Sequence, residues 1–184
     1  MIQLARLTDL PDRDAALRGL EEIFFLSALR TGFASGRERA DFFRTWAGWY
    51  LGHAPANVWF ALDGEGAVLG YLTGCKDSAG AGAAGLDGTI PKYEVFADLF
   101  AAFPAHLHVN VRPEHRSAGL GRRLVDRFAE DCAADGLAGV HLVTGAEARN
   151  AAFYRRAGFT EEHRRGPLLF LGRRLDTRGG ILPA

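Results

Sequence analysis

The residues best suited to chemistry follow an apolar segment that ends near Val111 and leads into a turn with two glycines, Gly119 and Gly121. A helix that starts at this turn leaves backbone N–H groups unpaired at its positive end, and such groups bind phosphate. Glycine lets a phosphate approach the main chain closely, and neighbouring arginines can pair with its oxygens. Those arginines are Arg116, Arg122 and Arg123. The alternative is a turn that only packs a helix onto a sheet.

A second motif follows further along the chain, where Asn150 precedes Tyr154 and the pair Gly158-Phe159. Together with the spacing Arg116-x-x-Gly119-x-Gly121, this resembles the GNAT superfamily of acetyl-CoA-dependent acetyltransferases. The resemblance is most specific over residues 106–160. Three shorter strings, at 49–51, 70–74 and 104–108, also resemble the GNAT branch that includes bacterial relatives of the acetyltransferase-like domain of O-GlcNAcase.

The resemblance implies that acetyl-CoA is the cosubstrate and indicates where the chain would hold it. In the family, the central strand offers its main chain to the pantetheine amides, and the glycine-rich loop binds the diphosphate. The implied cofactor-binding residues are Val109, Asn110, Val111, Arg116, Ser117, Ala118, Gly119, Leu120, Gly121, Arg122, Asn150 and Tyr154. One departure is that Glu147 stands where the family usually has asparagine, so we expect Asn150 to replace that contact or the helix start to be shifted.

Acetyl transfer to an amine needs a proton donor for the departing thiolate and a base for the ammonium. Tyr154 matches the family's proton donor, and the alternative is a core tyrosine. The base is open: His106 and His108 are candidates because an imidazole titrates near neutral pH. For each histidine taken alone, a structural role is the favoured alternative. Glu94 and Asp98 are further candidates, and Glu147 is another whose simpler explanation is a helix start.

Composition narrows the class of protein. The chain has 184 residues, with 22 acidic and 22 basic side chains, so no net charge favours nucleic acid or an anionic membrane. We expect one domain over residues 1–184 with a frayed tail at 176–184. Cys75 and Cys132 lack metal or disulfide spacing, so we expect reduced thiols and no metal. Without a signal peptide or a long apolar run, we expect a cytoplasmic protein.

Hydrophobic periodicity predicts the elements that position these residues. Strands alternate with helices in the second half, which favours an α/β fold with a parallel pair inside a mixed sheet. The GNAT resemblance implies about six or seven strands, about four or five flanking helices and splayed central parallel strands. We expect residues 78–88, rich in alanine and glycine, to form a mobile loop. The expected strands are 2–7, 58–62, 67–75, 106–111, 139–143 and 168–175, and the expected helices include 17–24, 37–51, 91–103, 119–135 and 146–157.

Two functions from different classes remain open. The first is an N-acetyltransferase acting on a small amine or a protein amino group, as a monomer or homodimer. The second is a catalytically inactive module that binds acetyl-CoA or CoA, suggested by Glu147 and by Ala105, where some family members carry a glutamate. A Rossmann dinucleotide site is disfavoured, because the first strand is not followed by G-x-G-x-x-G. The aromatic residues of 42–50 are expected in the core, with an acceptor pocket as the alternative.

Overall fold

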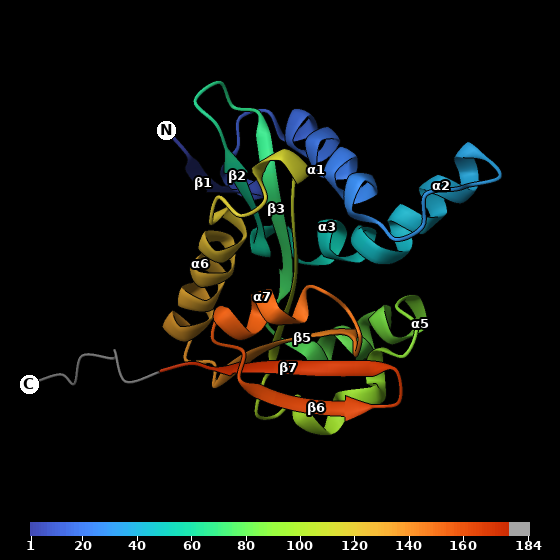
Figure 1. The fold of residues 1–184 in the computed structure, drawn as a ribbon, viewed down its shortest axis with the longest axis vertical. Coiled ribbons are helices and arrows are strands. Elements are labelled where there is room, and N and C mark those ends of the chain that lie inside the picture. The colour runs from blue at the N-terminus through green and yellow to red at the C-terminus, as the bar shows by residue number, and fades with distance from the viewer. Residues whose placement is uncertain (177–184) are drawn as a thin grey trace, which may run out of the picture. The chain divides into compact units, whose positions relative to one another are not determined.

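A computed structural model describes residues 1–176, whose seven strands form a mixed sheet in the order β1-β2-β3-β4-β5-β7-β6 (Figure 1). The predicted α/β fold with a mixed sheet of six or seven strands is therefore confirmed. The chain divides into two compact units, one formed by residues 1–74 with 108–125 and the other by 75–107 with the residues from 126 onward. That the whole chain is one domain stays a prediction. The predicted tail lies outside the described residues, apart from Asp176.

The first unit is built on three antiparallel strands, β1 (Gln3–Arg6), β2 (Val58–Leu62) and β3 (Val68–Cys75). Asp63 fixes the β2–β3 turn, because its Oδ1 accepts hydrogen bonds from two backbone N–H groups of the turn at 2.9 Å each. Helix α1 (Arg13–Ser27) lies along β2 and β3 (Figure 1) and buries Leu20, Ile23 and Phe24 against their apolar side chains. This face forms the core of the unit.

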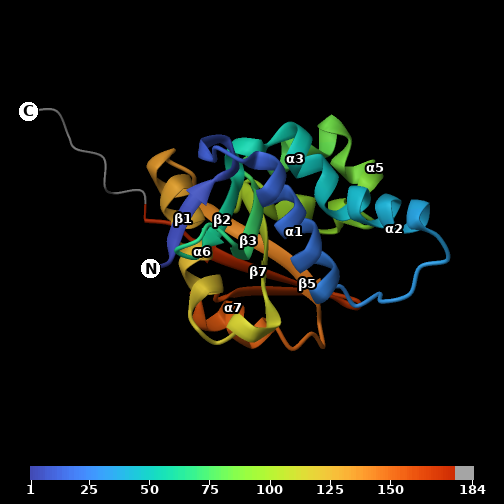
Figure 2. The same cartoon turned by 90° about the horizontal axis from the view of Figure 1, so that it is seen from above.

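The predicted helix at 37–51 is present but interrupted. It consists of α2 (Gly36–Phe43), a π-helical turn at Arg44–Gly48 and α3 (Trp49–His53), which follow one another in Figure 2. Ser35 caps α2 by accepting a hydrogen bond from the Glu38 N–H at 3.1 Å. The aromatic side chains of this stretch pack against the core of the first unit, as expected: Phe42, Phe43, Trp46 and the fully buried Tyr50.

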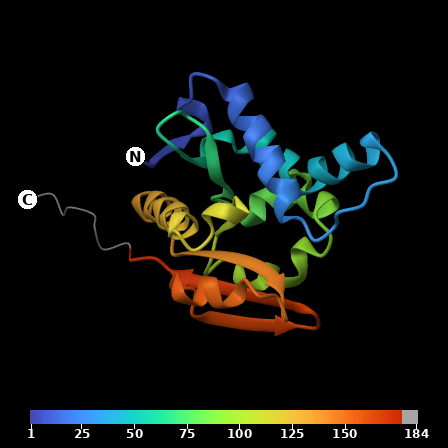
Figure 3. The ribbon, with the colours of Figure 1, turned by 45° about the horizontal axis from the view of Figure 1, so that its top comes forward.

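The second unit contains three antiparallel partners, β5 (Gly139–Gly145), β7 (Leu168–Arg174) and β6 (Glu161–Arg165), with α7 (Ala151–Arg156) beside β7 (Figure 3). β4 (Ala105–Val111) runs parallel to β5, yet the two strands pair only at Ala105↔Val140 and His106↔His141. Parallel pairing thus stops after two positions, as expected for splayed strands. α6 (Leu120–Ala134) follows β4 in sequence and belongs to both units.

The expectation of a mobile loop at 78–88 is wrong. The chain there forms α4 (Ser78–Ala81), a π-helical turn at Gly82–Leu86 and α5 (Asp87–Thr89). Asp77 caps the first turn by accepting a hydrogen bond from the Gly80 N–H at 2.9 Å. Ser78 and Leu86 are fully buried. The helical turns are broken at Gly85, whose φ is 95°, and the alanines, the Asp77 cap and the buried Leu86 favour the helical parts.

Three further expectations need correction. Tyr93–Leu99 is 3₁₀-helical and kinked at Phe96, rather than part of a regular helix at 91–103. The predicted helix at 146–157 begins only at Ala151. β6 is not among the expected strands, because its sequence Glu-Glu-His-Arg-Arg has no apolar alternation and four of its five residues are exposed. Its strand conformation comes from pairing with β7, which is tertiary information.

Candidate active site

The loop between β4 and α6 has the conformation of an anion-binding turn. Ser117 and Gly119 both have positive φ angles, 67° and 78°. The backbone N–H groups of Ser117, Gly119, Leu120 and Gly121 donate no hydrogen bond to any residue within 1–176. Such N–H groups, next to the positive end of a fifteen-residue helix, fit a diphosphate. The Ala118 N–H differs, because it donates to the His115 carbonyl at 3.4 Å.

Gly119 is required for its backbone conformation rather than for space. A Cβ atom built at this position would meet nothing within 4 Å, but the φ of 78° disfavours any L side chain. Ser117 adopts the same region without being glycine, which costs free energy and is typical of functional loops. Glycine is expected here both for close approach of a ligand and for its tolerance of positive φ, and the structure shows the positive φ at Gly119 but not at Gly121.

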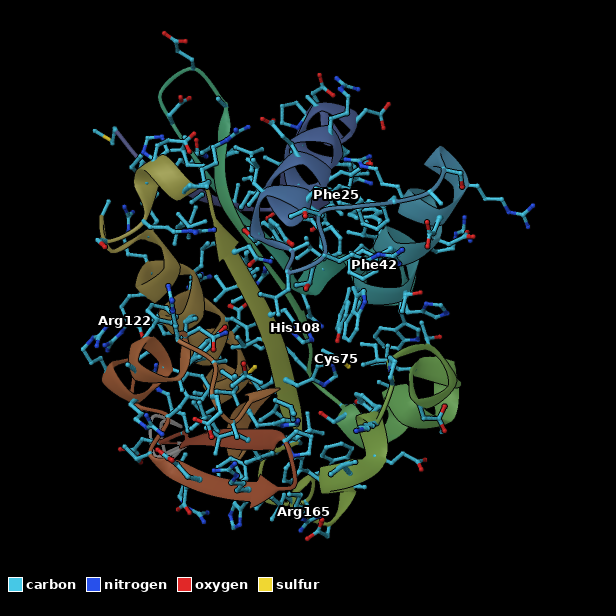
Figure 4. The ribbon with its side chains drawn as sticks, turned by 45° about the vertical axis from the view of Figure 1, so that its right-hand side comes forward. Phe25, Phe42, Cys75, His108, Arg122 and Arg165 are labelled. Atoms are coloured by element: carbon cyan, nitrogen blue, oxygen red, sulfur yellow. The ribbon has the colours of Figure 1, made fainter. Side chains whose placement is uncertain are left out.

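Arg116 is tied to the protein on both sides of the loop. Its Nε donates to the Val111 carbonyl at 3.3 Å, and its Nη2 lies 3.3 Å from the Ser27 Oγ at the end of α1. Its side chain therefore links the end of β4 to the end of α1, and its Nη1 is left for a ligand. Arg122 lies on the first turn of α6 (Figure 4).

The second half of β4 is held close to β3. Asn110 Nδ2 donates to the Tyr71 hydroxyl at 2.9 Å, and a Cβ at Gly70 would come within 3.1 Å of the Asn110 carbonyl. Arg112, the residue after the end of β4, makes a bidentate ion pair with Glu22, with N–O distances of 2.8 and 2.6 Å. The Asn110 side-chain amide nitrogen is thus already used on Tyr71, and the role implied by the resemblance concerns its main chain. Val109 and Val111 are half-buried beside it.

His108 lies on the half of β4 that belongs to the first unit (Figure 4) and is half-buried. The His108 ring packs edge-to-face with the ring of Tyr50, with 5.7 Å between the centroids. Burial lowers the pKa of His108 to about 4, because the imidazolium loses hydration there. This imidazole is neutral at neutral pH, and it is a weak base.

His106 is part of a buried hydrogen-bond network in the second unit. Its Nδ1 lies 2.8 Å from Ser78 Oγ, and that hydroxyl donates to the Pro104 carbonyl at 2.7 Å. Since the serine proton is used, we assign the proton of the His106–Ser78 bond to Nδ1. The Tyr93 hydroxyl donates to the Ser78 carbonyl at 2.7 Å. The network joins the start of β4 to α4 and gives His106 a structural role.

The three carboxylate candidates lie at the surface. Glu94 is exposed, beside the inward-facing Tyr93. Asp98 makes a bidentate ion pair with Arg165 at 2.7 Å for both bonds, and this guanidinium lowers the pKa of Asp98. Glu147 is exposed and lies 3.2 Å from the guanidinium of Arg164. None of the three is buried.

Tyr154, by contrast, has the environment of a proton donor. Its side chain is 5% exposed on α7 and packs edge-on against Phe153 and Phe159, with centroids at 4.9 and 5.7 Å. Burial raises the pKa of its phenol, so it keeps its proton at neutral pH. Its hydroxyl makes no hydrogen bond within the described residues. Asn150, at the start of α7, is exposed, and its Oδ1 accepts a hydrogen bond from Thr144 at 3.0 Å.

Sequence reasoning misses the partners of His106. Ser78 lies in the expected loop, and Tyr93 lies in the expected helix at 91–103. Both contact His106 across long stretches of chain, and no local pattern links such positions. The same holds for the Arg112–Glu22 ion pair, whose partners are 90 positions apart.

Comparison with known proteins decides the family. A sequence profile of the acetyltransferase (GNAT) domain matches residues 54–161, more than half of the chain. The chain belongs to the GNAT family. The predictions of this family and of acetyl transfer are therefore confirmed, whereas the O-GlcNAcase-related branch stays a prediction.

Solved structures of the same fold support this assignment. The crystal structure of SsHAT has a TM-score of 0.74 and 25% identity, covering 94% of this chain and 98% of that one. A GNAT superfamily phosphinothricin acetyltransferase from Sinorhizobium meliloti, in complex with AcCoA, has a TM-score of 0.55 and 21% identity over 100% and 92%. The paia N-acetyltransferase from Thermoplasma acidophilum, in complex with coenzyme A, has a TM-score of 0.60 and 14% identity over 95% and 99%.

Residues 1–176 contain neither a metal-binding cluster nor a membrane-spanning helix. Within this range, no group of three or more His, Cys, Asp or Glu side chains is arranged to hold a metal ion. The helices of the same residues are all too short or too polar to cross a membrane.

Proposed function

We propose that this chain transfers the acetyl group of acetyl-CoA to an amine acceptor. The observation that carries the proposal is the loop at 117–121, where four backbone N–H groups without partners in the described chain lie next to the start of α6. A diphosphate is the ligand that such a turn fits best. Acetyl-CoA carries this diphosphate and supplies an activated thioester.

The chain's own groups would then bind and orient the donor. The main chain of Val109, Asn110 and Val111 would pair with the pantetheine amides as a neighbouring strand would. Tyr154 would give its proton to the departing sulfur, since its raised pKa keeps it protonated at neutral pH. Backbone N–H groups of the central strand would stabilise negative charge on the carbonyl oxygen.

Among the base candidates, His108 remains for deprotonating the acceptor, and it is a weak base. His108 is neutral but its pKa of about 4 gives it little driving force to take a proton from an ammonium. We therefore propose that the acceptor reacts from its already neutral amine fraction, with His108 and water receiving the proton after attack. The rate should then increase with pH up to the pKa of the acceptor amine, without a step near pH 6.5.

The second candidate function is binding of CoA or acetyl-CoA without turnover. Its support is the state of the base candidates: His106 is hydrogen-bonded to Ser78, and Asp98 is paired with Arg165. A chain with the loop intact and no working base would take up the ligand but release no CoA.

Calorimetry with CoA and acetyl-CoA tests the cofactor part of the proposal. Wild type is compared with Gly119→Asp and with Gly136→Asp as the matched control. Gly136 has φ 77° and the same open surroundings, but it lies after the other end of α6. We expect Gly119→Asp to weaken binding about 100-fold by losing donor geometry and adding repulsion, and Gly136→Asp to bind like wild type. Equal binding by all three proteins would overturn the proposed diphosphate site.

Release of CoA from acetyl-CoA in a panel of primary amines tests turnover. The panel should include aliphatic amines, aryl-substituted amines and peptides with free N-termini, at several pH values. Amine-dependent release supports the transferase. Binding of acetyl-CoA with no release for any amine would support the binding module instead.

A further inference from the structure

A cavity of about 450 Å³ opens in the first unit where α1 ends and α2 begins. It is lined by Phe25, Arg30, Thr31, Phe33, Ser35, Gly36 and Arg39. The extended chain that joins the two helices is visible in Figure 3, and Figure 4 labels Phe25 on α1 and Phe42 on α2. The volume falls within the range of small-molecule sites. No sequence pattern predicts this cavity, because its residues lie on a helix end and a connecting segment.

The charged groups that line the cavity are all cationic. Arg30 and Arg39 contribute their guanidinium groups, and no carboxylate is among the lining side chains. Their ion-pair partners, Glu38 and Glu21, lie outside the lining, with Glu21 2.9 Å from Arg39 Nη1. Arg39 Nε and Nη2 make no hydrogen bond within the described residues. Arg30 uses Nε on the Gly32 carbonyl and Nη2 on Glu38, so the donors that the cavity offers to an anion are mainly those of Arg39.

The apolar wall consists of rings that hold these guanidiniums in place. The Arg39 guanidinium carbon lies 3.5 Å from the centroid of Phe25, and that of Arg30 lies 4.7 Å from the centroid of Phe33. Phe25 and Phe33 meet edge-to-face at 5.6 Å. A guanidinium stacked on a ring loses less freedom when it binds a planar carboxylate. Rings and guanidiniums together fit a ligand that is both aromatic and carboxylated.

The position of the cavity links it to the cofactor loop within the same unit. Ser27, the last residue of α1, lies between Phe25 and Arg30 in sequence, and its Oγ is 3.3 Å from Arg116 Nη2. Arg116 itself contacts the end of β4 through the Val111 carbonyl. Arg116 thus ties the end of α1, the helix that contributes Phe25 to the cavity, to the turn that is proposed to hold the diphosphate.

We propose that this cavity binds the carboxylate-bearing aromatic part of the amine acceptor. The inference rests on the proposed acetyl transfer and adds the class of substrate: an amine that carries an aromatic ring and a carboxylate. A phosphate ester fits less well, because the guanidiniums stand against rings and the remaining donors are few. An uncharged aryl amine would use the rings but leave the free donors of Arg39 unpaired.

A matched pair of acceptors tests the inference. 4-(Aminomethyl)benzoate and 4-methylbenzylamine share a ring and a primary amine, and only the first has a carboxylate. We expect kcat/KM to be at least about tenfold higher for the acid, as for one charge-assisted hydrogen bond. Arg39→Gln and Arg30→Gln should each raise KM for the acid about tenfold, leaving kcat within about twofold and KM for the methyl compound unchanged.

The control variant is Arg37→Gln on the same helix. Arg37 is 93% exposed on α2 and is not part of the lining, so this variant should behave like wild type with both amines. Thermal melting of the three variants would confirm that they fold equally. All three substitutions remove an exposed positive charge, so a general charge effect would appear in the control as well.

Ligand-observed NMR with 4-(aminomethyl)benzoate and no acetyl-CoA separates this inference from the proposed function. Binding that is lost in Arg39→Gln supports the cavity even if no acetyl transfer is seen. Equal binding by wild type and Arg39→Gln, or no binding at all, overturns the inference. The acetyl-transfer proposal would still stand in that case if other amines release CoA, and it fails only on CoA binding and the amine panel.

Discussion

Two alternate positions of β4, 106 and 108, carry a histidine in different environments. His106, near the start, is buried and hydrogen-bonded to Ser78. His108, two positions later, is half-buried against the edge of Tyr50, and burial alone lowers its pKa to about 4. The difference shows that hydrogen-bond partners distant in sequence, such as Ser78, give a histidine on a central strand a structural role, whereas its position on the strand does not.

The environments of the two histidines bear on which group handles the proton in the proposed reaction. If neither is a strong base, the titratable group that matters most for turnover lies outside β4. Tyr154 is the group with a defined protonation state and a hydroxyl without a partner in the described chain. Variants at four positions test this contrast, and the largest effect is expected at Tyr154.

Replacing Tyr154 with phenylalanine removes the proton donor and little else. We expect kcat to fall about 100-fold, the lower end of what a general acid contributes, while CoA affinity stays within about twofold. Steady-state kinetics and calorimetry measure both quantities. Tyr93→Phe is the matched control, because it also removes one hydroxyl from a tyrosine whose pKa is raised by burial.

The control should lose stability rather than turnover. Tyr93 donates to the Ser78 carbonyl at 2.7 Å, so its loss should cost about 1 kcal/mol of unfolding free energy. If Tyr93→Phe reduced kcat as much as Tyr154→Phe, the assignment of acid chemistry to Tyr154 would be wrong.

His108 should make the protein less stable in acid. Its folded pKa of about 4 lies below the unfolded value of about 6.5, so the unfolded chain binds more protons between these values. Stability is therefore lost as pH falls from about 6.5 to about 4. Urea unfolding at about pH 7 and about pH 4.5 should show a loss about 1–2 kcal/mol smaller in His108→Gln than in wild type.

An exposed histidine provides the control for this measurement. His53→Gln, at the end of α3, should show the same acid-dependent loss as wild type. A His108→Gln variant that lost as much stability in acid as wild type would show that this imidazole is not held neutral by its surroundings.

Ser78→Ala tests the environment of His106. The substitution leaves the buried His106 Nδ1 without its 2.8 Å partner, which should lower the free energy of unfolding by about 1–2 kcal/mol. We expect the pH dependence of kcat to be unchanged, because His106 is structural. A shifted pH profile would instead assign His106 to the proton transfer.

The smallest effect is expected at the start of α7. Asn150→Ala removes the exposed 3.0 Å hydrogen bond from Thr144, with a cost of about 0.5–1 kcal/mol in chemical denaturation. If Asn150 also contacts the cofactor, CoA affinity will fall as well. Unchanged affinity would limit its role to positioning the helix that carries Tyr154.

Much of the fold is predictable because its signals are local. The β2–β3 hairpin, α1 and α6 follow hydrophobic periodicity and turn chemistry that a short window contains. β6 and the helical turns at 78–89 are not, because a polar strand and an alanine-glycine segment depend on what they pack against. Propensity alone cannot supply that information.

The candidate site likewise has a part that the sequence predicts and a part that it does not. The glycine loop has a sequence signature because backbone conformation at Gly119 restricts the residue type. The histidine partners and the Arg–Phe cavity have none, since Ser78 meets His106, and Arg39 meets Phe25, only after folding. These side chains are brought together only by tertiary contacts between positions that are far apart in the sequence.

The outer strand β6 also limits how this protein can associate. Four of its five side chains are charged, two acidic and two basic, and four of the five residues are exposed. A free strand edge crowded with charge is a poor template for recruiting another strand, so neither a peptide acceptor nor a second copy is expected to extend the sheet on this side. Self-assembly through the sheet would therefore have to use the opposite edge strand, β1, rather than β6.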